Sequence, residues 1–230
     1  MNETRWQRLG ATSGILFVIL TFATFFTPST PDADKPAAEI AQTIADDRGA
    51  HILNFYVSGL AWLLFLVFVA FLWDVLRTSE GGSRASVLAL LGGVAVYAGV
   101  LVEQSAFLAL VNAADAGREP VAVRALYELE EVVLVPLRFA IAAFFLGIAL
   151  AAIPARALPR WLGWTAAALA ALLVVGLLGV FSADEEDGPL VPILVLGRLG
   201  VLLWILAAST VLLRRSRPAQ PSRAHARAAT

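Results

Sequence analysis

Six apolar segments, each long enough to cross a membrane as a helix, constrain this chain more than any other feature of its sequence. A transmembrane helix needs about 20 predominantly apolar residues to cross the roughly 30 Å hydrocarbon core of a bilayer. The segments lack the apolar and polar alternation of a membrane barrel, and lipid offers no partner for an unpaired backbone group. We therefore expect six transmembrane helices, at residues 9–27, 51–73, 87–111, 132–153, 161–181 and 190–213.

The composition supports a single membrane domain. Of the 230 residues, 59% are hydrophobic and 15% are charged, which is too apolar for a soluble domain of this length. The predicted fold class is all-α, a polytopic membrane helical bundle that occupies residues 1–213. Residues 214–230 are rich in Arg, Ala, Pro and Ser and are predicted to form a disordered basic cytoplasmic tail. A cleaved signal peptide is the alternative for the first segment, because Arg5 and Arg8 precede it.

The distribution of basic residues predicts the orientation of the bundle. By the positive-inside rule, the loops and tails that are rich in Lys and Arg lie in the cytoplasm. The richer side comprises the N-terminus, the second and fourth connections and the C-terminal tail, with Arg5, Arg8, Arg77, Arg84, Arg156, Arg160, Arg214, Arg215, Arg217, Arg223 and Arg227. The other side has Lys35, Arg48, Arg118 and Arg124 and most acidic residues. Both termini are therefore expected to be cytoplasmic.

Two external connections contain short helical patterns. Apolar residues recur at helical spacing within residues 37–45, which predicts a short surface helix. Pro120 opens a second such stretch, which either forms a short interfacial helix or extends the fourth span outward. Small residues spaced four apart, such as Gly10 and Gly14, predict close helix packing. We interpret them as contacts within the chain, with a homo-oligomer as the alternative.

The residue inventory excludes several classes of chemistry. The chain has no cysteine and two histidines, so neither disulfides, thiolate metal sites nor a three-histidine metal centre fit within one chain. No cofactor, metal or nucleic acid is therefore predicted, and no P-loop or dinucleotide motif is present. An enzyme is not predicted either. Glu130-Glu131 and Arg138 resemble the glutamate and arginine signature of intramembrane prenyl-protein proteases, but the spacing differs and the histidine elements are missing.

Two short segments carry a resemblance to a known class of protein. Residues 156–163, RALPRWLG, and residues 8–14, RLGATSG, each lead into an apolar segment. Both resemble the matching segments of uncharacterised bacterial six-span membrane proteins that are classed as domains of unknown function. The excess of Arg over Lys also resembles proteins from GC-rich, actinobacterial-like genomes. The resemblance implies a location in the bacterial inner (plasma) membrane and assigns no activity.

Three ionisable residues are predicted to lie inside the membrane at a shared depth, near the outer ends of the third, fourth and sixth segments. At 1.5 Å per helical residue, each lies roughly 10 to 13 Å below the outer surface. Charged groups at this depth are costly, so we expect them to face the bundle interior and to pair. With polar residues of the same outer half, they form the candidate ligand-binding set Glu103, Arg138, Arg198, His51, Asn54 and Gln104.

Three functional hypotheses follow from this set. In the first, two arginines against one glutamate leave an outward-facing, net positive pocket for an anionic small ligand or a lipid headgroup, with His51, Glu130 and Glu131 at its rim. In the second, the chain is a structural or partner-binding subunit whose charged layer only fixes helix packing. A small transporter is the third, opposed by the apolar inner half of the bundle.

Contacts with lipid are the predicted partnership of the chain. The apolar segments contact the bilayer itself. Arg214, Arg215 and Arg217 are candidate contacts for anionic lipid at the inner leaflet, with a stop-transfer charge cluster as the simpler interpretation.

Overall fold

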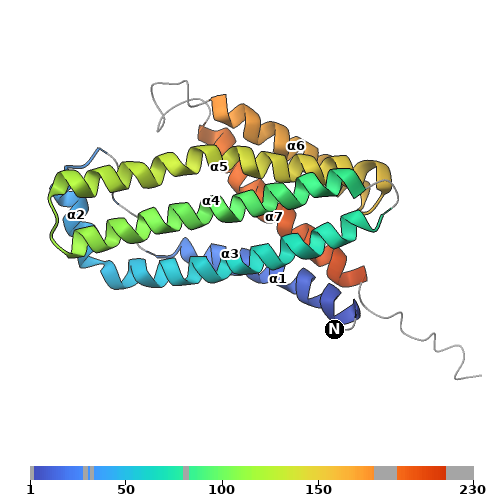
Figure 1. Ribbon diagram of the computed structural model, residues 1–230, viewed down its shortest axis with the longest axis horizontal. Coiled ribbons are helices and arrows are strands. Elements are labelled where there is room, and N and C mark those ends of the chain that lie inside the picture. The colour runs from blue at the N-terminus through green and yellow to red at the C-terminus, as the bar shows by residue number, and fades with distance from the viewer. Residues whose placement is uncertain (1–2, 28–30, 32–33, 80–82, 179–190, 216–230) are drawn as a thin grey trace, which may run out of the picture.

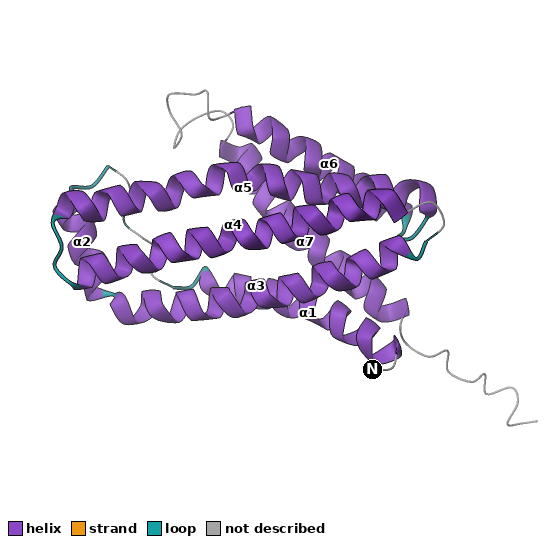
Figure 2. Cartoon of the chain, in the orientation of Figure 1, coloured by secondary structure: helices purple, strands orange, loops and turns teal. Residues whose placement is uncertain are grey.

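The described part of the chain is entirely α-helical. The computed structural model describes residues 3–27, 31, 34–79, 83–178 and 191–215. Seven helices follow one another in these residues, and no strand occurs among them (Figure 1, Figure 2). The helices are α1 (Glu3–Thr24), α2 (Ala37–Asp46), α3 (Arg48–Arg77), α4 (Ser83–Asp115), α5 (Pro120–Ala155), α6 (Arg160–Gly176) and α7 (Val191–Arg215). The predicted all-α class is confirmed.

Five helices are long and apolar enough to cross a membrane, namely α1, α3, α4, α5 and α7. The expected segment 161–181 corresponds to α6, which is apolar but has only 17 residues and ends at Gly176. The acidic stretch 184–187 lies outside the described residues. Arg214 and Arg215, which were predicted to belong to the tail, are the last residues of α7. Arg217 and the rest of the tail are not described.

The helices close into a ring. Every helix except α2 packs mainly on two neighbours, in the order α1, α3, α4, α5, α6, α7 and back to α1. Aromatic side chains fill the interior in a chain from Phe17 through Phe65, Phe144 and Phe145 to Trp204, with ring centroids 5.2 to 5.7 Å apart. The Trp204 indole N–H donates to a backbone carbonyl of α6 at 2.9 Å. This apolar filling closes the middle of the ring.

Glycines set the register between α4 and α5. A Cβ atom on Gly92 would overlap the backbone of Phe144, and one on Gly147 would overlap the backbone of Ala89. Because both pairs fit the same antiparallel register, the two helices touch backbone to backbone along one line, which we call the α4–α5 seam. Gly99 continues the seam, since its missing side chain leaves room for Leu137. The seam fixes which residues of α4 and α5 meet further along.

The three longest helices extend beyond the others at one end. Helices α3, α4 and α5 have 30, 33 and 36 residues, or about 45 to 54 Å at 1.5 Å per residue, which exceeds the roughly 30 Å hydrocarbon core. In Figure 1 they project to the left past the ends of α1, α6 and α7, and α2 lies across their tips. We call α2 and these projecting tips the cap.

The cap has an apolar core of its own. Ile40 and Ile44 of α2 are fully buried against Leu110 and Val111 of α4 and Val123 of α5. The predicted surface helix at 37–45 is thus confirmed as α2. The stretch that opens at Pro120 is the beginning of α5, so it extends that long apolar helix rather than forming a separate helix. Pro120 suits this place, because the first helical residue needs no N–H partner.

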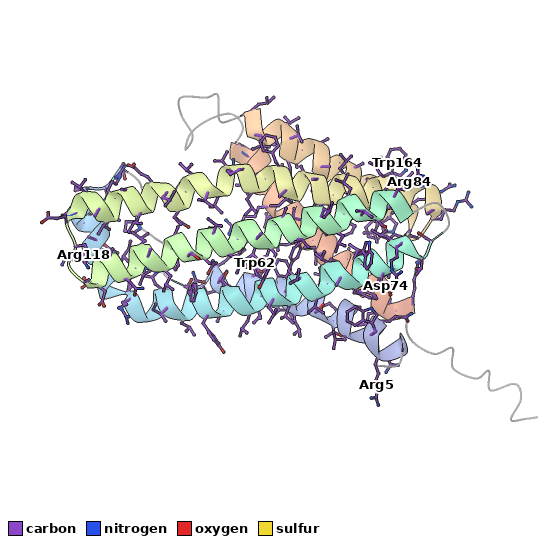
Figure 3. The ribbon with its side chains drawn as sticks, in the orientation of Figure 1. Arg5, Trp62, Asp74, Arg84, Arg118 and Trp164 are labelled. Carbon is purple, nitrogen blue, oxygen red and sulfur yellow. The ribbon has the colours of Figure 1, made fainter. Side chains whose placement is uncertain are left out.

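Charged side chains mark the two ends of the bundle. Arg118 lies at the cap end, whereas Arg5, Asp74 and Arg84 lie at the opposite end (Figure 3). At the cap end, Arg48 forms an ion pair with Asp115 at 3.0 Å. Between these ends the helices present mostly apolar side chains, as a bilayer requires.

Candidate functional site

A cavity of about 370 Å³ lies where the ring of helices meets the cap. It stands beyond the aromatic filling of the ring, at the level where α1 ends. Five of the seven helices contribute to its wall, and only α2 and α6 do not. The lining residues are Thr24, Phe25, Thr27, His51, Asn54, Phe55, Glu103, Gln104, Phe107, Glu130 and Arg198. The wall is therefore polar on α3, α4, α5 and α7 and aromatic between these groups.

Most of the predicted site residues meet at this cavity. His51, Asn54, Glu103, Gln104 and Arg198 all line it. The sixth predicted residue, Arg138, is half-buried on α5 and is not among the lining residues. Its spacing of eight residues from Glu130 places it about two helical turns further along α5 and about 80° round the helix axis. The structure thus brings together five of the six.

Glu130 is a wall residue that the sequence placed only at the rim. Its carboxyl group hydrogen-bonds to the carboxyl group of Glu103. The α4–α5 seam accounts for this contact, because its register brings Glu130 within about one turn of the residue opposite Glu103. The sequence held one signal for this contact, namely the glycines Gly92, Gly99 and Gly147 of the two helices. They predict a close seam only when the two helices are aligned antiparallel.

The two carboxyl groups belong to one polar network that also includes Gln104 and Ser58. Gln104 adds to the pair, since its Nε2 donates to Glu103 Oε2 at 3.0 Å and to Ser58 Oγ at 3.3 Å. A carboxylate can accept a hydrogen bond from the nitrogen of an amide but not from its oxygen. These two bonds therefore fix the orientation of the Gln104 amide.

Four buried polar atoms at the cavity have no hydrogen-bond partner among the described residues. They are Nδ1 and Nε2 of His51, Oδ1 of Asn54 and Oε1 of Gln104. The His51 side chain is only 1% exposed and packs edge-on against Phe107, with ring centroids 5.8 Å apart. Each buried polar group without a partner costs about 1 to 3 kcal/mol. These unpartnered groups therefore lower the stability of the folded chain appreciably.

Arg198 provides the basic group of the cavity. Its guanidinium carbon lies 5.0 Å from the centre of the Phe25 ring, a cation–π contact that ties α7 to the end of α1. Arg198 attracts Glu103 electrostatically, yet no ion pair joins it to an acid within the described residues. The charged wall therefore consists of two carboxyl groups and one guanidinium, rather than the two arginines and one glutamate expected.

Comparisons with known proteins identify no relative of this chain. No family model matches it, and neither a curated protein nor a solved structure gives a match. The resemblance to bacterial six-span proteins accordingly stays a prediction. Within the described residues, no group of three or more His, Asp or Glu side chains is placed to hold a metal ion.

Proposed function

We propose that this chain is a multi-pass inner-membrane protein whose cap-end cavity opens outward and binds a small ligand with an anionic group, either free or as a lipid headgroup. The observation that carries the proposal is the set of buried, unpartnered polar atoms on His51, Asn54 and Gln104. Polar groups in a protein interior are ordinarily hydrogen-bonded, so such a set points to a partner that the chain itself does not supply.

Six membrane crossings and cytoplasmic termini form part of the proposal. The 17 residues of α6 amount to about 26 Å at 1.5 Å per residue, which is near the lower limit for a transmembrane helix. With α6 crossing, the strongly basic connections lie on one side and the cap lies on the other. The positive-inside rule then supports an external cap and an outward cavity.

The place and size of the cavity support a ligand of headgroup size. The volume of about 370 Å³ lies near the lower end of the range for small-molecule pockets. The cavity stands at the end of α1, close to the level at which the hydrocarbon core ends. Arg198 is exposed and free of an acid partner among the described residues, so its guanidinium is available to a phosphate or carboxylate.

A purely structural role is the second candidate, and one observation favours it. The hydrogen bonds of Gln104 and Glu103 join α4 to both α3 and α5, so they also fix helix packing. Buried polar groups specify register in some helical assemblies. A purely structural role, however, provides no hydrogen-bond partner for the two nitrogens of His51 and no acid partner for the exposed guanidinium of Arg198.

Ligand-dependent thermal stabilisation separates the two candidates. The purified full chain in detergent is heated with inorganic phosphate, glycerol 3-phosphate, phosphoethanolamine or phosphocholine. A ligand at about 100 times its Kd stabilises the folded state by about 2.7 kcal/mol, which raises the melting temperature measurably. We expect at least one compound to stabilise the chain, and Arg198→Gln to abolish that effect.

Arg138→Gln is the matched control, since Arg138 lies on a transmembrane helix but outside the cavity lining. It loses the same charge and is expected to retain the response. If none of the four phosphates stabilises the chain in a manner that depends on Arg198, the ligand site is wrong and the structural role is supported.

A further inference from the structure

We propose that the ligand is a zwitterion in which a primary ammonium group is joined by a short linker to a phosphate, as in an ethanolamine phosphate headgroup. This class rests on the ligand site proposed above and adds the identity of the group that faces the acids. Three features of the wall carry it: the separation of its charges, its excess of acceptors and its aromatic surfaces.

The acidic and basic groups lie on opposite sides of the ring. Glu103 and Glu130 come from α4 and α5, whereas Arg198 and its partner Phe25 come from α7 and α1. These are opposite pairs of neighbours in the ring of helices. The cavity is thus preorganised as a dipole. A simple anion satisfies only Arg198 and is repelled by the acids, whereas a zwitterion satisfies both poles.

The wall around the acids offers acceptors in excess of donors. Both N–H bonds of the Gln104 amide are used within the protein, which leaves its Oε1 as an unpartnered acceptor. Asn54 Oδ1 is a second unpartnered acceptor. The carboxyl oxygens of Glu103 and Glu130 add further acceptors. A primary ammonium supplies three N–H donors, whereas a quaternary ammonium supplies none, so the wall selects the primary amine.

Aromatic rings complete the surroundings of the ammonium. Phe55 and Phe107 line the cavity beside these acceptors, and a cation near an aromatic face is stabilised electrostatically. Phe25 is already covered by the guanidinium of Arg198. Arg198 in turn suits a phosphate, because a guanidinium forms paired hydrogen bonds with phosphate oxygens. The two poles of the wall therefore suit the two opposite charges of an aminoethyl phosphate.

The first experiment compares the affinities of phosphoethanolamine, phosphocholine and inorganic phosphate for the full chain in detergent, by isothermal titration or thermal shift. We expect phosphoethanolamine to bind at least about tenfold more tightly than phosphocholine, a difference of about 1.4 kcal/mol. If the three compounds bind with equal affinities that depend on Arg198, selection of the primary amine is wrong but the proposed anion site is supported. No Arg198-dependent binding of any phosphate would overturn both.

A variant of one acid tests the assignment of the ammonium. Glu130→Gln keeps a hydrogen-bonding group but removes a carboxyl, so we expect it to lose the preference for phosphoethanolamine over phosphocholine while phosphate still binds. Glu128→Gln is the matched control, because Glu128 is an exposed carboxyl of the same helix and does not line the cavity. Far-ultraviolet circular dichroism of each unliganded variant checks that it is folded. A preserved preference in folded Glu130→Gln would contradict the proposal.

Native mass spectrometry distinguishes the free compound from the lipid. The chain is reconstituted in nanodiscs of phosphatidylethanolamine with phosphatidylglycerol, or of phosphatidylcholine with phosphatidylglycerol. Retention of phosphatidylethanolamine, lost in Glu130→Gln, identifies a lipid headgroup as the source. Retention of neither zwitterionic lipid, with tight binding of soluble phosphoethanolamine, identifies the free compound. Equal retention of the two zwitterionic lipids would contradict selection of the primary amine.

Discussion

The carboxyl groups of Glu103 and Glu130 hydrogen-bond to each other between α4 and α5, at the wall of the cap-end cavity. Neither acid lies in a loop. Both stand on helices whose backbones touch along the α4–α5 seam, so their distance is set by helix packing rather than by side-chain mobility. Such rigid placement is what a binding site requires of its charged groups.

The carboxyl pair yields a prediction about folding. Glu103→Gln is expected to preserve stability within about 1 kcal/mol, because an amide still hydrogen-bonds to Glu130. Glu103→Ala is expected to cost about 1 to 3 kcal/mol, since it removes the partner of both Glu130 and Gln104 in a buried place. Chemical or thermal unfolding in detergent measures the difference. Equal stabilities of the two variants would show that the hydrogen bonds at this site do not matter for folding.

For the buried imidazole of His51 we predict that substitution raises the stability of the folded chain. His51→Phe replaces two unpartnered nitrogens by carbon and keeps the edge-on contact with Phe107. We expect the unliganded chain to become more stable by about 1 kcal/mol, while the ligand response is lost. Leu53→Phe, at an exposed position of the same helix, serves as control and should change neither quantity. A less stable His51→Phe chain would indicate that the nitrogens have partners in solution.

The orientation and wetness of the cavity are accessible to thiol labelling, because the chain has no cysteine of its own. In intact spheroplasts treated with an impermeant maleimide, Thr27→Cys at the cavity wall is expected to react. Val100→Cys, one turn below Glu103 and 2% exposed, is expected to stay unlabelled. Arg84→Cys, at the opposite end, should react only after permeabilisation. Labelling of Arg84→Cys alone would reverse the proposed orientation, and protection of Thr27→Cys by phosphoethanolamine would place the ligand.

The α4–α5 seam predicts which glycine is irreplaceable. Gly147→Ala places a methyl group into the backbone of Ala89 and is expected to cost about 1 to 3 kcal/mol of stability. Gly59→Ala, on α3, meets nothing within 4 Å and should be neutral or stabilising by up to about 1 kcal/mol, since alanine favours a helix. Unfolding in detergent compares the two. A well-tolerated Gly147→Ala would mean that the seam is looser than the structure shows.

Depth along a helix proved easier to predict from the sequence than direction around it. His51, Asn54, Glu103, Gln104 and Arg198 were grouped because all lie in the predicted outer half of their apolar segments, and they do line one cavity. Hydrophobicity carries that information, because the bilayer fixes where a segment begins and ends.

The positions of Glu130 and Arg138 could not be predicted from hydrophobicity. Glu130 was assigned to the rim because the apolar segment begins at residue 132, yet α5 is already helical from Pro120. Arg138 was placed in the cavity by depth alone, whereas the structure leaves it outside the lining. Both outcomes depend on how far each helix continues and on its rotation against its neighbours. Those properties come from packing, such as the contact of Gly147 with Ala89, and not from local composition.

The unequal lengths of the helices also shape the route into the cavity. Helices α3, α4 and α5 rise past the cavity into the cap, whereas α1 ends at Thr24 on the cavity wall. In the proposed orientation, an amphiphile of the outer leaflet would approach the α1 side of the cavity by lateral diffusion, without leaving the bilayer. Its occupancy is then governed by its mole fraction among neighbouring lipids rather than by its concentration in water, so even a weak site would be filled whenever that lipid is abundant.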